Sequence, residues 1–324
     1  LVKKKVITNP NEDFSKPAII IANHTSFLDT LAIAMATHKI VYLVNDWVYD
    51  SPVFGKLVKA LGFFPVSHGI ENGKEKLTEK IDRGYSLVVF PEAERSYTND
   101  VKRFHKGAFY LAEEFGLDIL PLYIHGNSEV LPKGDFVIYD GNIIVKVGER
   151  ISKDDLSFGN TFKERTKKIN AYFRDEFSKL RTEIEDENYF KRQLFLSFLY
   201  KETDVVKEVK QDFNENKSVY FELNKHIAKD ATILHIADDF GQKEVLLTLQ
   251  QAGRKVFSFI ENEEKRQIAH NNYLVKRRKL NYIKNISETP KDIDVLLVSD
   301  NGFDINEMTR LPKTIIFINT KNVN

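Results

Sequence analysis

Short apolar runs alternate with helical segments over roughly the first 150 residues. Five runs have the length and composition of buried strands, at residues 18–22, 40–44, 86–90, 119–124 and 143–147. Between them, residues 53–61 and 109–115 repeat apolar side chains at helical spacing. This alternation predicts an α/β domain with a buried sheet.

The pattern changes after about residue 160. Residues 161–229 are dense in charge and helical in pattern, and they contain no alternating strands. Strand-like runs then return at residues 232–237, 255–260, 294–298 and 314–319. Their β–α–β order predicts a right-handed parallel sheet. We therefore expect an α/β domain over 1–160, a helical connector over 161–229 and a Rossmann-like parallel-sheet domain over 230–324.

Length and composition suit two ordinary globular domains. The 324 residues are 42% hydrophobic, and 48 Lys and Arg against 47 Asp and Glu give a net charge of +1. A near-neutral chain has no broad cationic surface for nucleic acid, so nucleic-acid binding is not expected. The chain has no cysteine, which excludes disulfides, thiolate metal sites and cysteine nucleophiles and favours a cytoplasmic location.

Membrane and targeting segments are not apparent in the sequence. No apolar run reaches the roughly 18 residues needed to span a bilayer, and no signal-peptide pattern opens the chain. Residues 1–6 have the pattern of an internal segment and the first residue is Leu1, so we expect the chain to come from a longer polypeptide.

The most informative segment is A-I-I-I-A-N-H-T-S-F-L-D, residues 18–29. A buried strand ends there and a helix is predicted to begin near Ser26, so His24 follows the C-terminal end of a strand, where open α/β sheets bind ligands. Asp29 is near enough to bind one imidazole nitrogen and fix the tautomer. His24 would then accept a proton from a hydroxyl or an amine. The alternative is a capping or core histidine beside a solvated Asp29.

A second predicted strand, residues 86–90, runs directly into P-E-A-E-R-S. Glu92 and Arg95 therefore lie on the loop after that strand. We expect this loop and the His24 loop to open onto one cleft.

Four blocks follow one another along the chain: N-H-x-S-x-x-D, F-P-E-x-x-R-S, F-x-K-G-A-x-x-L-A and L-P-L-x-I-x-G. With them, residues 15–150 resemble the glycerolipid acyltransferase family typified by lysophosphatidic acid acyltransferase. The resemblance implies transfer of a fatty acyl group from a thioester of coenzyme A or acyl carrier protein, without a cofactor. A thioester brings its own leaving group, so the scheme needs no serine or cysteine nucleophile.

The resemblance also implies roles for the residues at its matching positions. His24 would be the general base, and Asp29 would orient it. The implied substrate-binding positions are Glu92, Arg95, Ser96, Lys106 and Gly107. Arg95 suits an anionic oxygen through its planar fork of donors. For Lys106 and Gly107 the alternatives are a surface charge and a helix-packing residue.

Two departures from the family pattern concern the acceptor. The usual F-P-E-G-T-R has become F-P-E-A-E-R, which puts Glu94 beside the expected phosphate site. The block expected to end in a phosphate-binding arginine has Ser67 and His68 instead. One cation is missing and one anion is added, which predicts an acceptor other than a simple glycerophosphate.

An apolar and aromatic stretch with interleaved lysines occupies residues 47–64. It would line an acyl channel or lie on a membrane surface, and core packing explains the same composition. Family members reach lipid substrates at the bilayer, so we expect contact with a membrane.

Residues 232–241, T-I-L-H-I-A-D-D-F-G, resemble the first motif of class I methyltransferases. Gly241 and, at the end of the next strand, Glu261 are the candidate cofactor-binding residues. Ala237 and Asp239 stand where that motif has its first two glycines, and a Cβ and a carboxylate there hinder close approach of a ligand. We expect a degenerate methyltransferase-like domain, and S-adenosylmethionine is not expected as a cofactor.

The sequence therefore favours an acyltransferase acting on a hydroxyl or amine of a lipid or pigment precursor. One alternative is an S-adenosylmethionine-dependent methyltransferase whose N-terminal domain binds lipid, and another is a catalytically silent lipid-binding module. No metal-ligand spacing occurs among the eight histidines, so a metal is not expected. The tandem of domains also resembles the soluble part of polypeptides with a resistance-nodulation lipid exporter, which implies a place at the inner face of the cell membrane.

Overall fold

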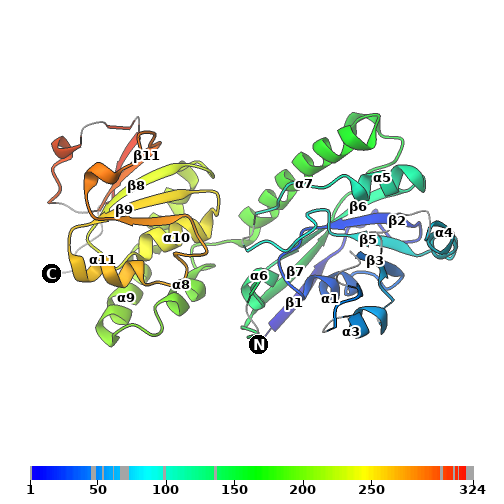
Figure 1. Ribbon diagram of the computed structural model, residues 1–324, viewed down its shortest axis with the longest axis horizontal. Coiled ribbons are helices and arrows are strands. Elements are labelled where there is room, and N and C mark those ends of the chain that lie inside the picture. Colours follow the sequence, from blue (N-terminus) through cyan, green and yellow to red (C-terminus); the bar gives the residue numbers. More distant parts are fainter. Residues whose placement is uncertain are drawn as a thin grey trace. The chain divides into compact units, whose positions relative to one another are not determined.

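The structure is a computed structural model that describes residues 2–44, 49–52, 55–60, 62–65, 73–97, 100–134, 137–299, 302–308, 311–312 and 314–318. It divides into two compact units, Leu1–Arg181 and Thr182–Asn324. Each unit is built on a sheet of its own (Figure 1).

The first unit is a mixed α/β domain. Its elements are β1 (Val2–Ile7), β2 (Ala18–Ala22), α1 (Asp29–Ala34), β3 (Ile40–Val44), α3 (Gly55–Ala60), β4 (Phe64–Pro65), α4 (Lys74–Asp82), β5 (Ser86–Val89), α5 (Gly107–Glu114), β6 (Asp118–His125), α6 (Asn127–Val130), β7 (Gly141–Val147), the 3-10 turn η1 (Leu156–Phe158) and most of α7 (Phe162–Ile184). The strand order is β1-β7-β6-β2-β5-β3-β4. Strands β6 to β4 in that order are parallel, β7 is antiparallel to β6, and β1 is parallel to β7. The α/β fold is as the sequence predicts, and β1 and β4 are additional strands.

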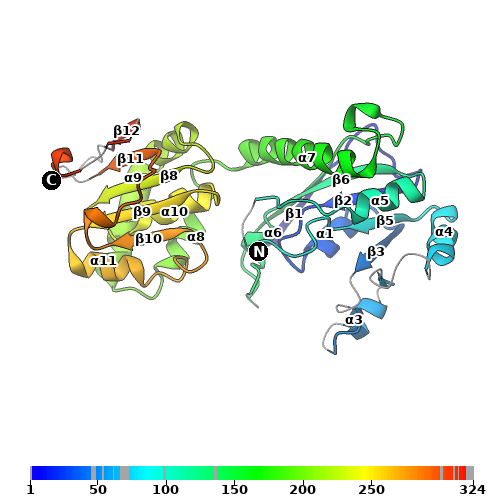
Figure 2. The same cartoon turned by 45° about the horizontal axis from the view of Figure 1, so that its top comes forward.

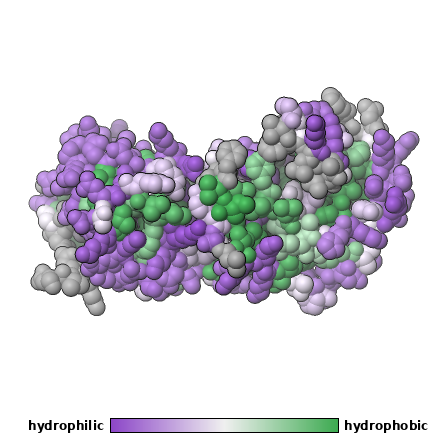
Figure 3. Space-filling view, turned by 90° about the horizontal axis from the view of Figure 1, so that it is seen from below, coloured by the Kyte–Doolittle hydropathy of each residue, from purple (hydrophilic) through white to green (hydrophobic). Residues whose placement is uncertain are grey.

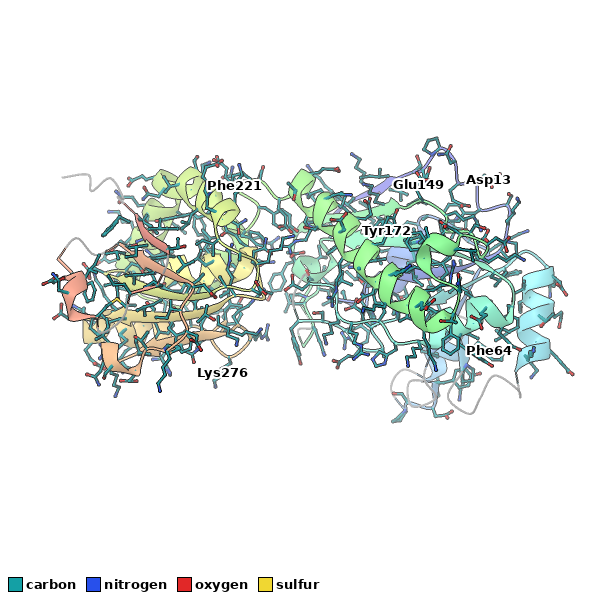
Figure 4. All side chains as sticks on the ribbon, turned by 90° about the horizontal axis from the view of Figure 1, so that it is seen from above. Asp13, Phe64, Glu149, Tyr172, Phe221 and Lys276 are labelled. Atoms are coloured by element: carbon teal, nitrogen blue, oxygen red, sulfur yellow. The ribbon has the colours of Figure 1, made fainter. Side chains whose placement is uncertain are left out.

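Helices cover both faces of this sheet (Figures 1 and 2). On one face, Ile33 of α1 packs with Ile20 and Leu120. On the other face lie α5 and α7; Phe173 of α7 contacts Tyr123 of β6, with ring centroids 4.6 Å apart. Figure 4 shows α7 lying across this face, with Tyr172 labelled on the helix. Because β2 is completely buried between the two layers, it is a continuous apolar run in the sequence.

The second unit is Rossmann-like. It contains α8 (Lys191–Ser197), α9 (Thr203–His226), β8 (Thr232–Ala237), α10 (Gln242–Gln250), β9 (Lys255–Ile260), α11 (Glu263–His270), β10 (Leu280–Ile283), η2 (Ile286–Glu288), β11 (Val295–Val298), η3 (Ile305–Glu307) and β12 (Thr314–Phe317). The strand order is β10-β9-β8-β11-β12, and every pair is parallel. The chain leaves β8 toward β9 on one side and returns to β11 on the other, so the topological switch point lies between β8 and β11.

The stretch expected as a separate connector, residues 161–229, is helical and is divided between the two units. Phe173 and Phe177 of α7 are buried in the first unit. Val209 and Phe213 of α9 belong to the core cluster of the second unit. Each helix has an apolar stripe that needs a partner, and each sheet supplies one.

Ala93 is in the left-handed region, with φ of 62°. It follows β5, in a turn where its N–H donates to the carbonyl of Phe90 at 3.0 Å. A non-glycine residue in this region costs roughly 1–2 kcal/mol, because its Cβ approaches the following carbonyl. The loop that follows β5 therefore contains backbone strain.

We expect Ala93→Gly to raise the free energy of unfolding of the first unit by roughly 1 kcal/mol, since glycine adopts this φ without the Cβ contact. The measurement is urea unfolding followed by the fluorescence of Trp47, the single tryptophan of the chain. Ala108→Gly, inside α5, is the matched control and should lower the stability by roughly 1 kcal/mol. A destabilised Ala93→Gly protein would contradict the assignment of strain.

Candidate functional site

Two neighbouring parallel strands end side by side at the candidate site. Strands β2 and β5 pair with Ile21 opposite Val89, so both C-terminal ends lie at the same edge of the sheet. His24 follows β2 and Phe90 follows β5, and their rings stack with centroids 4.1 Å apart. The two loops expected to open onto one cleft are therefore in contact.

His24 and Asp29 form a hydrogen-bonded pair. The Nδ1 atom of His24 lies 2.8 Å from Oδ2 of Asp29, which is fully buried at the start of α1. A carboxylate only accepts, so Nδ1 carries a proton, and in the neutral ring Nε2 is then the nitrogen with the lone pair. The His24 side chain is 21% exposed. The pair can thus present a neutral imidazole base to a ligand.

Asp29 is held by three further donors. Its Oδ2 accepts the backbone N–H of Thr25 at 2.7 Å and of Ser26 at 2.9 Å. Its Oδ1 accepts the side-chain amide of Asn127, at the start of α6, at 2.6 Å. Helix α1 begins at Asp29 rather than near Ser26, because residues 25 and 26 turn their N–H groups toward this carboxylate.

Asn23 fixes the end of β2 to β6. Its side chain donates to the carbonyl of Ile124 at 2.8 Å and accepts the N–H of the same residue at 2.9 Å. Neither Asn23 nor Asn127 is predicted from the sequence to have a role at the site. Asn23 adjoins His24 in the quoted motif, whereas Asn127 lies about a hundred residues away and has no local pattern to reveal it.

Glu92 joins the two loops through their backbones. Its Oε1 accepts the N–H of His24 at 2.8 Å, and its Oε2 accepts the N–H of Lys102 at 2.8 Å. Burial raises the pKa of Glu92 to about 7, although both backbone N–H groups oppose the shift. The side chain is 2% exposed and both oxygens already have donors. In this structure Glu92 therefore contacts backbone, where an acceptor head group was expected.

Arg95 lies beside the His24 loop. Its guanidinium stacks over the ring of Phe27 at 3.7 Å, and its backbone carbonyl accepts Nζ of Lys133 at 2.8 Å. The N–H of Ser96 donates to the carbonyl of His24 at 2.7 Å. Among the residues that the structure describes, no carboxylate lies within ion-pair distance of Arg95. Its charge is thus available to an anionic ligand.

Glu94 is neutralised by two lysines. Its carboxylate pairs with Nζ of Lys102 at 2.6 Å and lies 3.8 Å from Nζ of Lys133. The added anion that the sequence suggested is therefore paired with two lysines, while the carboxylate of Asp29 also acts on the charge of Arg95. Ser67 and His68, the other basis of that prediction, lie outside the described residues.

Lys106 and Gly107 lie at the exposed beginning of α5, next to the segment that Glu92 anchors. A Cβ built on Gly107 would have no neighbour within 4 Å. Packing within the unit therefore gives no reason for glycine at this position.

Residues 47, 48, 53, 54 and 61 of the aromatic stretch at 47–64 lie outside the described residues, and so do the side chains of residues 57 and 60. What is described includes Phe63, which stacks on Tyr42 with ring centroids 4.7 Å apart. Lys56 and Lys59 of α3 are exposed, and Lys59 lies 3.5 Å from Asp50.

In the second unit, the turn after β8 is closed by its own side chains. Asp239 accepts the N–H of Gly241 at 2.7 Å and Nζ of Lys243 at 2.8 Å. Burial acts to raise the pKa of Asp239, but the Lys243 ammonium holds it below its ordinary value. A Cβ at Gly241 would lie 2.4 Å from the hydroxyl of Tyr282 on β10, so no free space remains on that side.

These residues do not fit S-adenosylmethionine. The cofactor would have to approach the backbone at the turn that Asp239, Lys243 and Tyr282 occupy. Glu261 is exposed at the end of β9, on the strand next to β8. Gly241 and Glu261 thus lie at the expected edge of the sheet, beside a turn that is already filled.

The described residues contain neither a cluster of metal ligands nor a helix that could cross a membrane. No group of three or more histidine, aspartate or glutamate side chains there is arranged to hold a metal ion. No helix among them combines the length and the apolar character that crossing a bilayer requires.

Comparison with known proteins assigns a family to the first unit. Residues 3–125 match the Acyltransferase family model. The chloroplastic 1-acyl-sn-glycerol-3-phosphate acyltransferase LPAT1 of Arabidopsis thaliana is 26% identical over 147 residues, which cover 43% of this chain and 41% of the relative. The 1-acyl-sn-glycerol-3-phosphate acyltransferase of Cocos nucifera is 30% identical over 46% of this chain and 51% of its own length.

The chain spans about half the length, or less, of these curated relatives. A crystal structure of the 1-acyl-sn-glycerophosphate acyltransferase PlsC from Thermotoga maritima is 22% identical, with a TM-score of 0.48 over 57% of this chain and 75% of that one. Residues 3–125 of this chain therefore match the Acyltransferase family model and are similar in sequence to the 1-acyl-sn-glycerol-3-phosphate acyltransferases.

Proposed function

We propose that the first unit transfers a fatty acyl group from a thioester to a hydroxyl of a lipid acceptor, with His24 as general base. The observation that carries this proposal is the hydrogen bond between His24 Nδ1 and buried Asp29 at the end of β2. In the neutral ring this bond places the proton on Nδ1 and leaves Nε2, on a partly exposed side chain, as the basic nitrogen. The donor is a thioester of coenzyme A or acyl carrier protein, and no cofactor takes part.

The reaction needs one proton relay. Nε2 of His24 takes the proton of the acceptor hydroxyl as that oxygen bonds to the thioester carbonyl carbon. Asp29 stabilises the imidazolium that forms. When the tetrahedral intermediate collapses, the carbon–sulfur bond breaks and the departing thiolate receives the proton. Histidine is regenerated, and the acyl group stays on the acceptor oxygen.

The charges around Arg95 favour an anionic acceptor. Lys102 and Lys133 together offset Glu94, while Arg95 keeps its donors. Arg95 is held in place from two sides, by the Phe27 ring and by Lys133. A lysophospholipid with a phosphate head group supplies the oxygens that a guanidinium binds best. The sequence predicted an acceptor other than a simple glycerophosphate. The present proposal is instead an acceptor that carries a phosphate.

The lipid acceptor reaches the site from a membrane surface. Phe27 and Leu31 are large exposed apolar side chains four residues apart, directly after His24. Val137 and Ile138 are also exposed in this unit. Figure 3 shows apolar side chains gathered on one face of the first unit. An apolar surface beside a lipid-modifying site suits contact with a bilayer.

We expect His24→Ala to lower acyl transfer by about 10²–10⁴-fold, the usual contribution of a general base. The assay follows labelled acyl groups from both thioesters into lysophosphatidate. His38→Ala is the matched control, because His38 is exposed in the same unit and should be replaceable without effect. Transfer by His24→Ala at the wild-type rate would rule out the proposed base.

Arg95→Gln should lower kcat/KM for lysophosphatidate about 10- to 100-fold, the value of one or two charge-assisted hydrogen bonds. The kcat/KM for monoacylglycerol, which carries no phosphate, should fall much less. The competition between the two acceptors is measured for wild type and variant. If the wild-type protein prefers monoacylglycerol, the proposal of an anionic acceptor is wrong, and only the proposal of acyl transfer remains.

Leu31→Glu should weaken binding to vesicles containing anionic lipid, because a charge replaces an apolar contact at the interface. Leu31 is 60% exposed and Leu156, on η1, is 67% exposed, which makes Leu156→Glu a control of equal chemistry elsewhere in the unit. Co-sedimentation with vesicles measures both. Equal binding by the two variants would refute the assignment of this face.

A further inference from the structure

A second histidine, His235 on β8, takes part in a chain of three side chains in the second unit. Its Nδ1 lies 2.7 Å from Oε1 of Glu244 on α10, and its Nε2 lies 2.6 Å from Oγ of Ser299. His235 and Glu244 are fully buried. Ser299 is partly exposed, so the chain of hydrogen bonds runs from the interior to the surface.

The three residues lie at the topological switch point of the sheet. Ser299 directly follows β11, and its N–H donates to the carbonyl of Ile236 on neighbouring β8 at 2.9 Å. The crevice outside the strand ends at such a point is where open α/β sheets bind ligands.

The arrangement has the geometry of an activated nucleophile. A hydroxyl within hydrogen-bond reach of an imidazole, whose other nitrogen is oriented by a carboxylate, is the constellation that activates serine on unrelated folds. Since Glu244 is an acceptor, Nδ1 of His235 carries the proton, and Nε2 accepts the proton of Ser299. The serine hydroxyl is thereby polarised toward oxygen.

A neighbouring serine shows what a purely structural role looks like. Ser258 on β9 is almost fully buried, and its Oγ donates to the same Glu244 oxygen at 2.5 Å without an intervening histidine. It helps to satisfy a buried carboxylate and has no path to a ligand. Ser299 differs from Ser258 in two respects. Its Oγ bonds to the imidazole of His235, and the residue is partly exposed.

We propose that Ser299 is a nucleophile that cleaves esters or thioesters, with His235 as its base and Glu244 as the residue that positions His235. The Oγ–carbonyl carbon bond forms while the proton moves to Nε2, and the alcohol or thiol leaves with that proton. Water then attacks the acyl-serine, giving its proton to Nε2 and from there to the departing serine. The net reaction converts an ester and water into an acid and an alcohol. It uses no residue of the first unit.

The experiment is reaction of the full chain with a fluorophosphonate probe, read out by peptide mass mapping. Serine attacks phosphorus, fluoride leaves and the label stays on Oγ. We expect one label per chain, on Ser299, and none there in Ser299→Ala. Labelling of Ser299 should slow about 100-fold in His235→Gln, and stay within about threefold of wild type in Ser15→Ala and His24→Ala.

Because His235 is buried, Glu244→Gln serves as a second variant of nearly equal size, with an expected loss of at least about tenfold. Circular dichroism identifies the variants that fold. Labelling of wild-type Ser299 no faster than that of exposed Ser15 would overturn the proposal whether or not the variants fold. Unchanged labelling in a folded His235→Gln protein would overturn it as well. The His24→Ala protein separates these outcomes from a failure of the proposed acyl transfer.

Discussion

The carboxylate of Asp29 is removed from water, and much of the candidate site is arranged to provide it with donors. A buried carboxylate without hydrogen-bond partners costs several kcal/mol, so its surroundings must satisfy it. The backbone N–H groups of Thr25 and Ser26, the amide of Asn127 and Nδ1 of His24 do so. These donors come from the loop after β2 and from α6, which follows β6. The buried carboxylate therefore fixes the conformation of the loop after β2 and connects this loop to α6.

Glu92, after the neighbouring strand β5, is a second buried carboxylate whose oxygens are satisfied by hydrogen-bond donors. Its two oxygens bind the N–H groups of His24 and Lys102, so the loops after β2 and β5 are joined through a side chain rather than through a sheet hydrogen bond. The turn that brings Glu92 into this position passes through the positive φ of Ala93. Strain of this kind persists where the surrounding contacts over-determine the backbone. The base and the cationic group of Arg95 are thus held on two loops that cannot move independently.

The sequence was sufficient to predict the strands that are buried on both faces. Strands such as β2 and β8 are covered on both faces, so they appear as unbroken apolar runs. Strand β1, V-K-K-K-V-I, lies at an edge and is mostly exposed, and the four-residue β10 contains Asn281, so neither has that pattern. The pairing of His24 with Asp29 follows from their spacing, because both lie on one turn. The neutralisation of Glu94 does not follow from sequence spacing, because Lys133 is 39 residues away and only the fold brings it near.

The two units place a histidine–carboxylate pair at different depths of a parallel sheet, and this difference determines what the free nitrogen can do. His24 lies beyond the end of its strand and its side chain is 21% exposed, so in the proposed reaction the hydroxyl comes from a ligand. His235 lies within β8 beneath α10, where Nε2 cannot meet solvent and instead bonds to Ser299 of the next strand. The first arrangement suits a base for a substrate hydroxyl, and the second supplies the hydroxyl itself. The two proposed activities thus differ in where the histidine–carboxylate pair lies, after the end of one strand or within another.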